Sequence, residues 1–379
     1  QGVRAGAALT LEPLGEGASD MVYDDLTEAV GQVVERVSTP WTREDARTLA
    51  ALSAAGLVFV AALLLATTPP DALTALDPKA VTRYNVIAGA IGIVAALLVT
   101  ATSAVMTQKH PQASGIALAH TVPFLTAASA LRLSQSHWDT AGWGWTGLGL
   151  LIGSLAVLAL PKRSRISIAA PLVVGTVLAA TGLLVRLGQL SQAGISAILF
   201  ALVIVLLQVA PWIALAHIPV RILDADTTEQ IPAKGITDQI STSFMFVVAL
   251  RAGGAIAALF LAVALMTAPE TRSVSLPLTL IVLGAVSLVL QTRSIRARVE
   301  VLLGALTGLI VILVAAVLGA YADPRTMPWL TLSAIATALV LVITNVVGPR
   351  ARPHLTRIAD TISVLSLFVL LPLAVYLWS

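Results

Sequence analysis

About eleven long stretches of this chain contain almost no charged residue. The run at 49–67, LAALSAAGLVFVAALLLAT, is the clearest of them. In a helix, roughly 20 apolar residues reach across a hydrocarbon core of about 30 Å. Backbone groups in lipid must be satisfied inside their own segment, and these runs lack the two-residue alternation of a barrel strand, so each is predicted to be a helix. The sequence therefore predicts an all-α, polytopic membrane protein.

The connecting segments differ strongly in positive charge, which predicts an orientation. The predicted spans are 48–67, 86–106, 115–131, 145–160, 168–187, 195–216, 247–266, 274–290, 299–321, 329–347 and 358–378. If the N-terminus is cytoplasmic, 17 of the 23 Lys and Arg residues lie on the cytoplasmic side. Cytoplasmic segments of membrane proteins are enriched in these residues. We therefore expect a multi-pass protein of the bacterial inner (cytoplasmic) membrane, with the N-terminus cytoplasmic and the C-terminus extracytoplasmic.

The composition leaves little room for chemistry outside the membrane. Only 11% of the residues are charged, against about a quarter in soluble proteins. Cysteine is absent, and so are HExxH, GxSxG and GxxxxGK[ST] motifs and an intramembrane Asp pair. We therefore predict no enzyme, no cofactor and no metal site, and any ATPase activity must come from a partner. The basic residues follow the topology and form no patch, so no nucleic acid is expected as a partner.

Few polar residues fall inside the predicted spans. His120 is the one ionisable residue well inside a span. It could relay protons, but it has no acidic or second histidine partner at helical spacing, which favours an interhelical hydrogen bond or a water-facing position. Gln208 and Asn345 are expected to form interhelical hydrogen bonds. Three arginines near span ends are expected to snorkel to the interface, namely Arg132, Arg186 and Arg251.

Two polar stretches are candidates for contact with other proteins. Residues 19–37 have apolar positions spaced by three or four, which predicts an amphipathic helix. Residues 217–246 form the longest predicted loop, which is acidic and cytoplasmic in this topology. The candidate partner-binding residues are Leu26, Val30 and Val33 in the helix and Asp224, Asp226 and Glu229 in the loop.

Small residues four apart recur in two predicted spans. Gly253 is followed by Ala257, and Gly304 is followed by Gly308. Such pairs let two helix backbones approach closely. In an Ala-rich chain the expected role is packing inside one molecule, and a face between two copies of the chain is the alternative.

Several segments between spans carry a resemblance to a known family. They are GVRAGAALTL from Gly2, VYDDLTEAV at 22–30, RSIRARVEVL at 293–302 and RPHLTRIADTISVLSLFVLLPLAVYLW at 352–378. They resemble, respectively, the end of a ubiquitin-like domain, a linker helix, a basic turn and the last helix of the EccD membrane component of type VII (ESX) secretion systems. The resemblance implies a C-terminal remnant of an upstream ubiquitin-like domain at 1–12. It also implies a cytoplasmic linker with the amphipathic helix at 13–47 and an eleven-helix transmembrane domain at 48–379.

The resemblance implies a non-catalytic scaffold. Such subunits pair with a second copy of themselves, enclose membrane lipids between their helix bundles and lie beside EccB-, EccC- and EccE-like subunits, of which EccC is the ATPase. The chain departs from the pattern in its acidic loop, which is shorter than the resemblance leads us to expect. The competing class is a secondary transporter or lipid flippase, which would require an inverted repeat, broken helices and a polar site at mid-membrane.

Overall fold

The computed structural model describes most of the predicted membrane domain. The described residues are 43–67, 78–109, 113–136, 139–160, 168–216, 233–270, 273–292, 298–328, 330–332, 335–336, 338–339 and 352–378. The chain divides into two compact units, Gln1–Leu49 and Ala50–Ser379. Only the first turns of one helix are described in the first unit. The predicted amphipathic helix at 19–37 lies outside the described residues.

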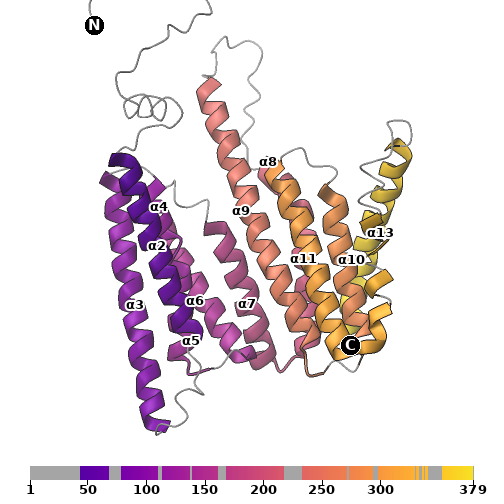
Figure 1. The fold of residues 1–379 in the computed structure, drawn as a ribbon, viewed down its shortest axis with the longest axis horizontal. Coiled ribbons are helices and arrows are strands. Elements are labelled where there is room, and N and C mark those ends of the chain that lie inside the picture. The colour runs from indigo at the N-terminus through magenta and orange to yellow at the C-terminus, as the bar shows by residue number, and fades with distance from the viewer. Residues whose placement is uncertain are drawn as a thin grey trace, which may run out of the picture. The chain divides into compact units, whose positions relative to one another are not determined.

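The described residues form helices and no strands (Figure 1). In chain order the elements are α2 (Arg43–Thr67), α3 (Pro78–Lys109), α4 (Ala113–Ala119), α5 (Val122–Leu133), α6 (Thr140–Leu158), α7 (Ala169–Gly188), α8 (Gln192–Ala216), α9 (Ala233–Met266), α10 (Ser275–Gln291), α11 (Arg298–Ala322), the 3₁₀ helix η5 (Pro324–Thr326) and α13 (Arg352–Trp378). Among the described residues, nine helical segments are long and apolar enough to cross a membrane, and α10 is a shorter apolar helix of 17 residues. The predicted all-α membrane class is confirmed. The count of eleven spans and the orientation of the termini stay predictions.

Several helices extend beyond their apolar runs. The prediction of a loop at 217–246 is wrong for its second half, because α9 begins at Ala233, whereas its membrane-length segment is Ser243–Met266. Hydropathy marks the part of a helix that lipid can surround, but helical hydrogen bonds continue through polar residues outside it. The acidic residues Asp224, Asp226 and Glu229 lie outside the described residues.

The third predicted span is broken into α4 and α5. Pro123 lies in the first turn of α5 and has no N–H to donate to the preceding turn. At the break, the Thr121 N–H donates to the carbonyl oxygen of Leu118 at 3.1 Å, and the Thr121 hydroxyl donates to the same oxygen at 2.8 Å. The Leu118 carbonyl at the break thus accepts two hydrogen bonds from Thr121, so this backbone group stays paired where the helix is interrupted.

Glycines allow the closest helix contacts. A Cβ atom on Gly147 of α6 would lie 2.7 Å from Cα of Ala179 in α7. On the other side of α6, a Cβ on Gly149 would lie 2.6 Å from the carbonyl oxygen of Thr126 in α5. The Thr126 hydroxyl also donates to the Gly149 carbonyl at 2.7 Å. Because glycine has no side chain, the backbones of α5, α6 and α7 pack directly on one another.

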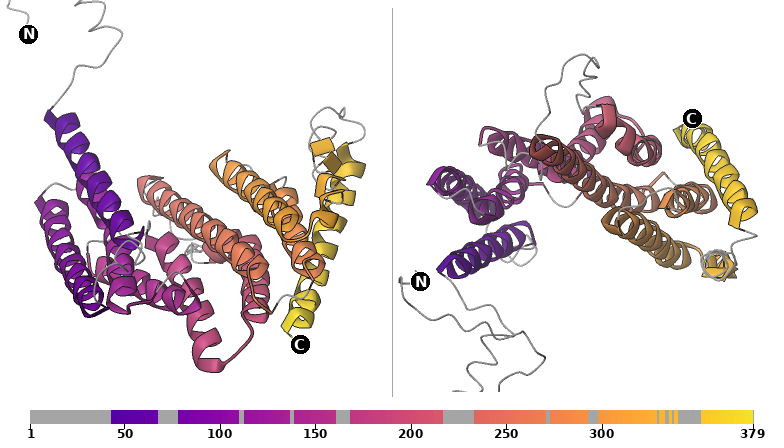
Figure 2. Two further views of the ribbon diagram at one scale, coloured as in Figure 1. Left: turned by 60° about the horizontal axis from the view of Figure 1, so that its bottom comes forward. Right: turned by 90° about the horizontal axis from the view of Figure 1, so that it is seen from above.

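The largest apolar core lies among the later helices. Figure 2 shows α10 next to both α11 and α13, and α9 contacts α7, α8 and α11. Fully buried side chains from α8, α9, α10 and α13 fill this core, including Phe200, Ile204, Leu261, Leu265, Leu280, Ile281 and Leu370. Polar side chains that enter this region must therefore find partners on neighbouring helices.

Candidate functional site

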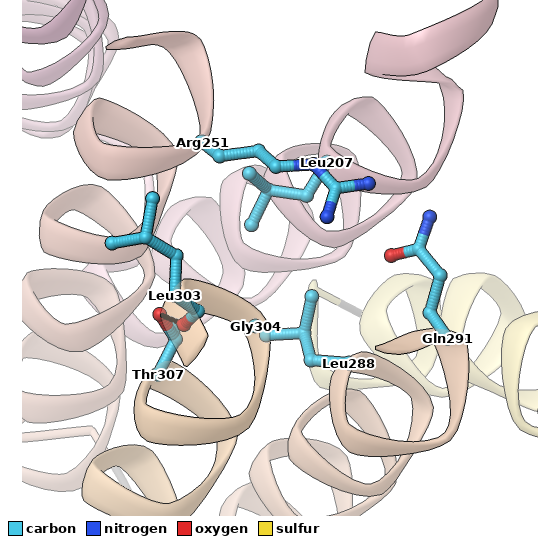
Figure 3. A pocket seen from close by; sticks show the side chains of 7 residues that line it. All are labelled: Leu207, Arg251, Leu288, Gln291, Leu303, Gly304 and Thr307. Carbon is cyan, nitrogen blue, oxygen red and sulfur yellow. Dashed lines mark hydrogen bonds between the residues drawn. The ribbon is translucent and has the colours of Figure 1, made fainter. Parts of the chain in front are cut away.

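Polar side chains of α8, α9, α10 and α11 meet at one place between these helices. We call this set the Arg251 cluster, and its members are Gln208, Arg251, Ser287, Gln291 and Glu300. Arg251 and Glu300 are 5% and 8% exposed. The Arg251 Nη1 atom lies 3.6 Å from Oε2 of Glu300, so the two charges form a buried ion pair between α9 and α11. Figure 3 shows the Arg251 guanidinium directed into the space that Gln291 also borders.

The Glu300 side chain has positive charge on two sides. Glu300 lies in the first turn of α11. Unpaired N–H groups give this end of a helix a partial positive charge, which stabilises a carboxylate. Arg251 supplies a full positive charge from the neighbouring helix. The helix end and Arg251 thus both place positive charge near the Glu300 carboxylate. The ion pair adds no net charge to the bundle.

Amide hydrogen bonds form the other half of the cluster. The Gln208 side-chain amide donates to the hydroxyl of Ser287, which joins α8 to α10. The Gln291 side-chain amide donates to the backbone carbonyl of Gln208 at 3.1 Å, which joins the same helices a second time. The predicted interhelical hydrogen bond of Gln208 is therefore confirmed, whereas Asn345 lies outside the described residues.

A small cavity lies beside Arg251 (Figure 3). Its volume is about 10 Å³, which is roughly the space that one water molecule needs. The other lining residues are Leu207, Leu288, Gln291, Leu303, Gly304 and Thr307. Two guanidinium nitrogens of Arg251, Nε and Nη2, have no hydrogen-bond partner within the part of the chain that is described. The site therefore offers donors and an ion pair in a space too small for an organic substrate.

The arrangement supports helix packing better than catalysis. In the described ranges, no group of three or more His, Cys, Asp or Glu residues could hold a metal ion. The cluster has one carboxylate, and its arginine partner is a group that stays protonated. Such a pair does not supply the acid and base that proton transfer needs. Its chemistry is that of a polar clamp joining four helices.

The expectation that Arg132 and Arg251 snorkel is wrong. Arg132 is 6% exposed, and its Nε–H donates to the carbonyl oxygen of Leu65 at 2.5 Å. Leu65 lies in the last turn of α2, where carbonyl groups have no donor within their own helix. Arg132 also donates from Nη1 to Oδ1 of Asn85 at 3.4 Å. Arg186, in contrast, is exposed.

Each glycine predicted to pack helices lies against another helix of this chain or beside the cavity. A Cβ on Gly253 would lie 2.6 Å from the carbonyl oxygen of Ala170 in α7. A Cβ on Gly308 would lie 2.9 Å from the carbonyl oxygen of Ala285 in α10, and Gly304 lines the cavity of the Arg251 cluster. The predicted partner-binding residues Leu26, Val30, Val33, Asp224, Asp226 and Glu229 all lie outside the described residues.

Glu300 was not among the predicted site residues, although its position in the sequence indicates a possible partner for Arg251. Glu300 is the second residue of the predicted span 299–321, and Arg251 is the fifth residue of the predicted span 247–266. Both span ends were predicted to face the cytoplasm. Two opposite charges at similar depth in the membrane are candidates for a pair even when neither span alone indicates one.

The family follows from the sequence match to this helical domain. A family model described as the EccD-like transmembrane domain matches residues 46–379. The chain belongs to the EccD family. The match begins two residues before the transmembrane domain predicted at 48–379 and runs to the last residue. The EccD family thus accounts for every described helix apart from the first residues of α2.

Two solved structures have a similar fold. Protomer 1 of the ESX-3 core complex matches with a TM-score of 0.65 and 18% identity, covering 98% of this chain and 83% of that chain. An ESX-5 inner membrane complex free of MycP5, in state II, matches with a TM-score of 0.58 and 16% identity, covering 88% of this chain and 78% of that chain. No curated protein matches the chain. At these identities the structural similarity shows the fold alone, and the family rests on the sequence match.

Proposed function

We propose that this EccD-family chain is a non-catalytic scaffold of a type VII protein secretion complex. In this role it pairs with a second copy of itself and organises EccB-, EccC- and EccE-like subunits in the inner membrane. The observation that carries the proposal is the EccD-like match over residues 46–379. The likeness to ESX-3 and ESX-5 complex structures supports the same role.

The character of the Arg251 cluster favours a scaffold over a transporter. A transporter or flippase needs polar groups that reach its substrate near mid-membrane. Here Arg251 and Glu300 are buried and paired with each other, and Glu300 lies at a helix end. The polar residues are thus used to hold helices together, which suits a subunit whose task is to keep other proteins in place.

Exposed apolar side chains on the outer helices support the same proposal. Leu57 of α2, Leu97 of α3, Leu313 of α11 and Phe368 of α13 are 60–74% exposed within this chain. In the membrane such surfaces contact lipid or the helices of other subunits, where van der Waals packing drives association. The described helices therefore leave large faces available for assembly.

A secretion assay tests the proposed function. The gene is deleted in its own bacterium, and type VII substrates are measured in the culture filtrate and in the cells. We expect the substrates to disappear from the filtrate and to return when the wild-type gene is restored. Unchanged export from the deletion strain would contradict a role in secretion.

Replacing His120 should leave export largely intact. The Nδ1 atom of His120 is 2.6 Å from the carbonyl oxygen of Ile116, one turn earlier in the same segment. This contact is local, so neither His120→Asn nor His120→Ala removes a link between helices. We expect substrate levels in the filtrate within about twofold of wild type, because the loss of a single hydrogen bond destabilises by about 1 kcal/mol. Complete loss of export at normal protein abundance would instead indicate a proton relay.

The amphipathic segment at 19–37 is proposed as an assembly element. Its apolar stripe precedes the first membrane span and includes Leu26, Val30 and Val33. Changing these three residues together to Asp should release the ATPase or neighbouring subunits, because buried charges disrupt an apolar contact. Membrane insertion should continue, since its signal lies downstream. Pull-down measures the release of partners, and membrane fractionation measures insertion. If the triple variant keeps every partner at wild-type stoichiometry, this segment is only a linker.

A further inference from the structure

Two hollows of different character meet at Ser134 and Trp145. One is an apolar groove of about 540 Å³ between α3, α5 and α6, with Leu97 and Ile152 among its walls. The other is a polar hollow of about 670 Å³ at the ends of α5, α6 and α7. Ser134 and Trp145 line both. An apolar groove that continues into a polar hollow matches the shape and polarity of a lipid, which has an apolar acyl chain and a polar headgroup.

The groove has the length of one membrane leaflet. Along α5 its lining extends from Val122 to Ser134, and along α6 from Trp145 to Ala156. At 1.5 Å per residue, these segments are about 17–18 Å long. Half of a hydrocarbon core of about 30 Å is about 15 Å. An acyl chain that follows the groove would therefore reach from the polar hollow to the middle of the membrane.

The polar hollow contains charges of both signs. Asp139 and Arg186 both line it and both are exposed. No ion pair joins them within the described part of the chain. Asp139 caps α6, since its Oδ1 accepts a hydrogen bond from the Gly142 N–H at 2.8 Å. Guanidinium groups bind phosphate well, and a carboxylate attracts an ammonium group, so the hollow matches a headgroup that carries both.

Trp145 marks the boundary between the two environments. It is 44% exposed and contributes to the walls of the groove and of the hollow. Tryptophan is enriched at the level of lipid headgroups because its ring is apolar and its N–H is polar. This places the polar hollow at the membrane surface and the groove in the hydrocarbon.

We propose that the groove and the hollow together bind one phospholipid with a zwitterionic amine headgroup. Its phosphate contacts Arg186, its ammonium group contacts Asp139, and one acyl chain lies along α3, α5 and α6. The opposite charges at the end of the groove favour this occupant over a membrane helix of another protein, which would bring no matching headgroup. The site does not depend on the proposed role in secretion, so the two can fail separately.

Lipid binding to the purified full-length protein tests the headgroup contacts. The protein is stripped of lipid and titrated with phosphatidylethanolamine or phosphatidylglycerol, and bound lipid is counted by native mass spectrometry. Asp139→Asn removes the charge but keeps a good helix cap. It should weaken phosphatidylethanolamine binding about threefold and leave phosphatidylglycerol binding unchanged, whereas Arg186→Gln should weaken both about threefold, as expected for exposed ion pairs. The headgroup assignment would be overturned if the wild-type protein bound both lipids equally and Asp139→Asn changed neither affinity.

A matched pair of tryptophan variants tests the groove. Ala156 lines it, whereas the neighbouring Leu155 is 59% exposed and is not part of its lining. Ala156→Trp should remove the bound lipid, and Leu155→Trp should retain it. If both variants bind as much lipid as wild type, or if a map of the assembled complex shows a protein helix in the groove, the lipid site is refuted.

Discussion

Arg251→Met and Glu300→Leu, made separately, are each expected to destabilise the folded chain by about 3–5 kcal/mol. Both residues are buried, and each faces the other at 3.6 Å. Removing one partner leaves the other as an uncompensated charge in an apolar surrounding, which is the costly outcome for a buried pair. The free energy of unfolding is measured by reversible denaturation in detergent micelles.

The double variant Arg251→Met/Glu300→Leu separates the ion pair from general damage to the packing. Replacing both charges by apolar side chains removes the unpaired charge, so the double variant should be more stable than either single variant. The exposed Arg186, changed to Gln, is the control and should leave the unfolding free energy nearly unchanged. A double variant that loses the sum of the two single effects would show that the charges do not act as a pair.

Gly182→Ala should be the most damaging alanine substitution between α6 and α7. A Cβ on Gly182 would lie 2.5 Å from the carbonyl oxygen of Thr140 and would overlap the backbone of Gly144. These obstacles are backbone atoms, which cannot change rotamer to make room. We expect destabilisation of about 3 kcal/mol, at the upper end for overpacking, and reduced abundance in membranes.

Gly56→Ala provides the matched control for this substitution. A Cβ on Gly56 would meet nothing within 4 Å, although Gly56 also lies inside an apolar helix. Alanine has the higher helix propensity, so stability should stay equal or rise by up to about 1 kcal/mol. Thermal unfolding of both purified variants tests the contrast, and similar melting temperatures would mean that the α6–α7 contact is looser than the geometry indicates.

Hydropathy predicts the membrane helices of this chain well but not their full lengths. An apolar run must match the lipid thickness, so the position of each membrane-spanning segment can be predicted from the sequence. The polar first turns of α9, from Ala233 to Thr242, carry no such constraint and were predicted as loop. The break between α4 and α5 lies just before Pro123, because a proline has no N–H to donate to the preceding helical turn.

The Arg251 cluster was only half predictable because its pairs depend on which helices face each other. Gln208 is a polar residue in an apolar span, so a partner on another helix was expected, and Ser287 is that partner. The Arg251–Glu300 pair joins two helices that are separated by α10 in the sequence. The sequence of one span does not show which other span it faces, so the Arg251–Glu300 pair was not predicted and Arg251 was expected to reach the interface.

The family was predictable from segments outside the membrane core. The basic turn at 293–302 and the segment at 352–378 carried the resemblance to EccD proteins, and the EccD-like family match over 46–379 confirms it. Apolar spans have a restricted composition and many sequences satisfy it, so turns and helix ends hold more information about ancestry. Partner contacts were expected at 19–37 and at 217–246, and these expectations stay predictions.

Quantitative mass spectrometry of the purified membrane complex tests the scaffold role most directly. The full-length protein is tagged on the chromosome of its own bacterium and isolated from membranes in a mild detergent. We expect EccB-, EccC- and EccE-like subunits to co-purify in fixed ratios, together with an untagged second copy when both forms are expressed. Recovery of the chain as a monomer free of these subunits, from membranes in which they are present, would contradict the proposal.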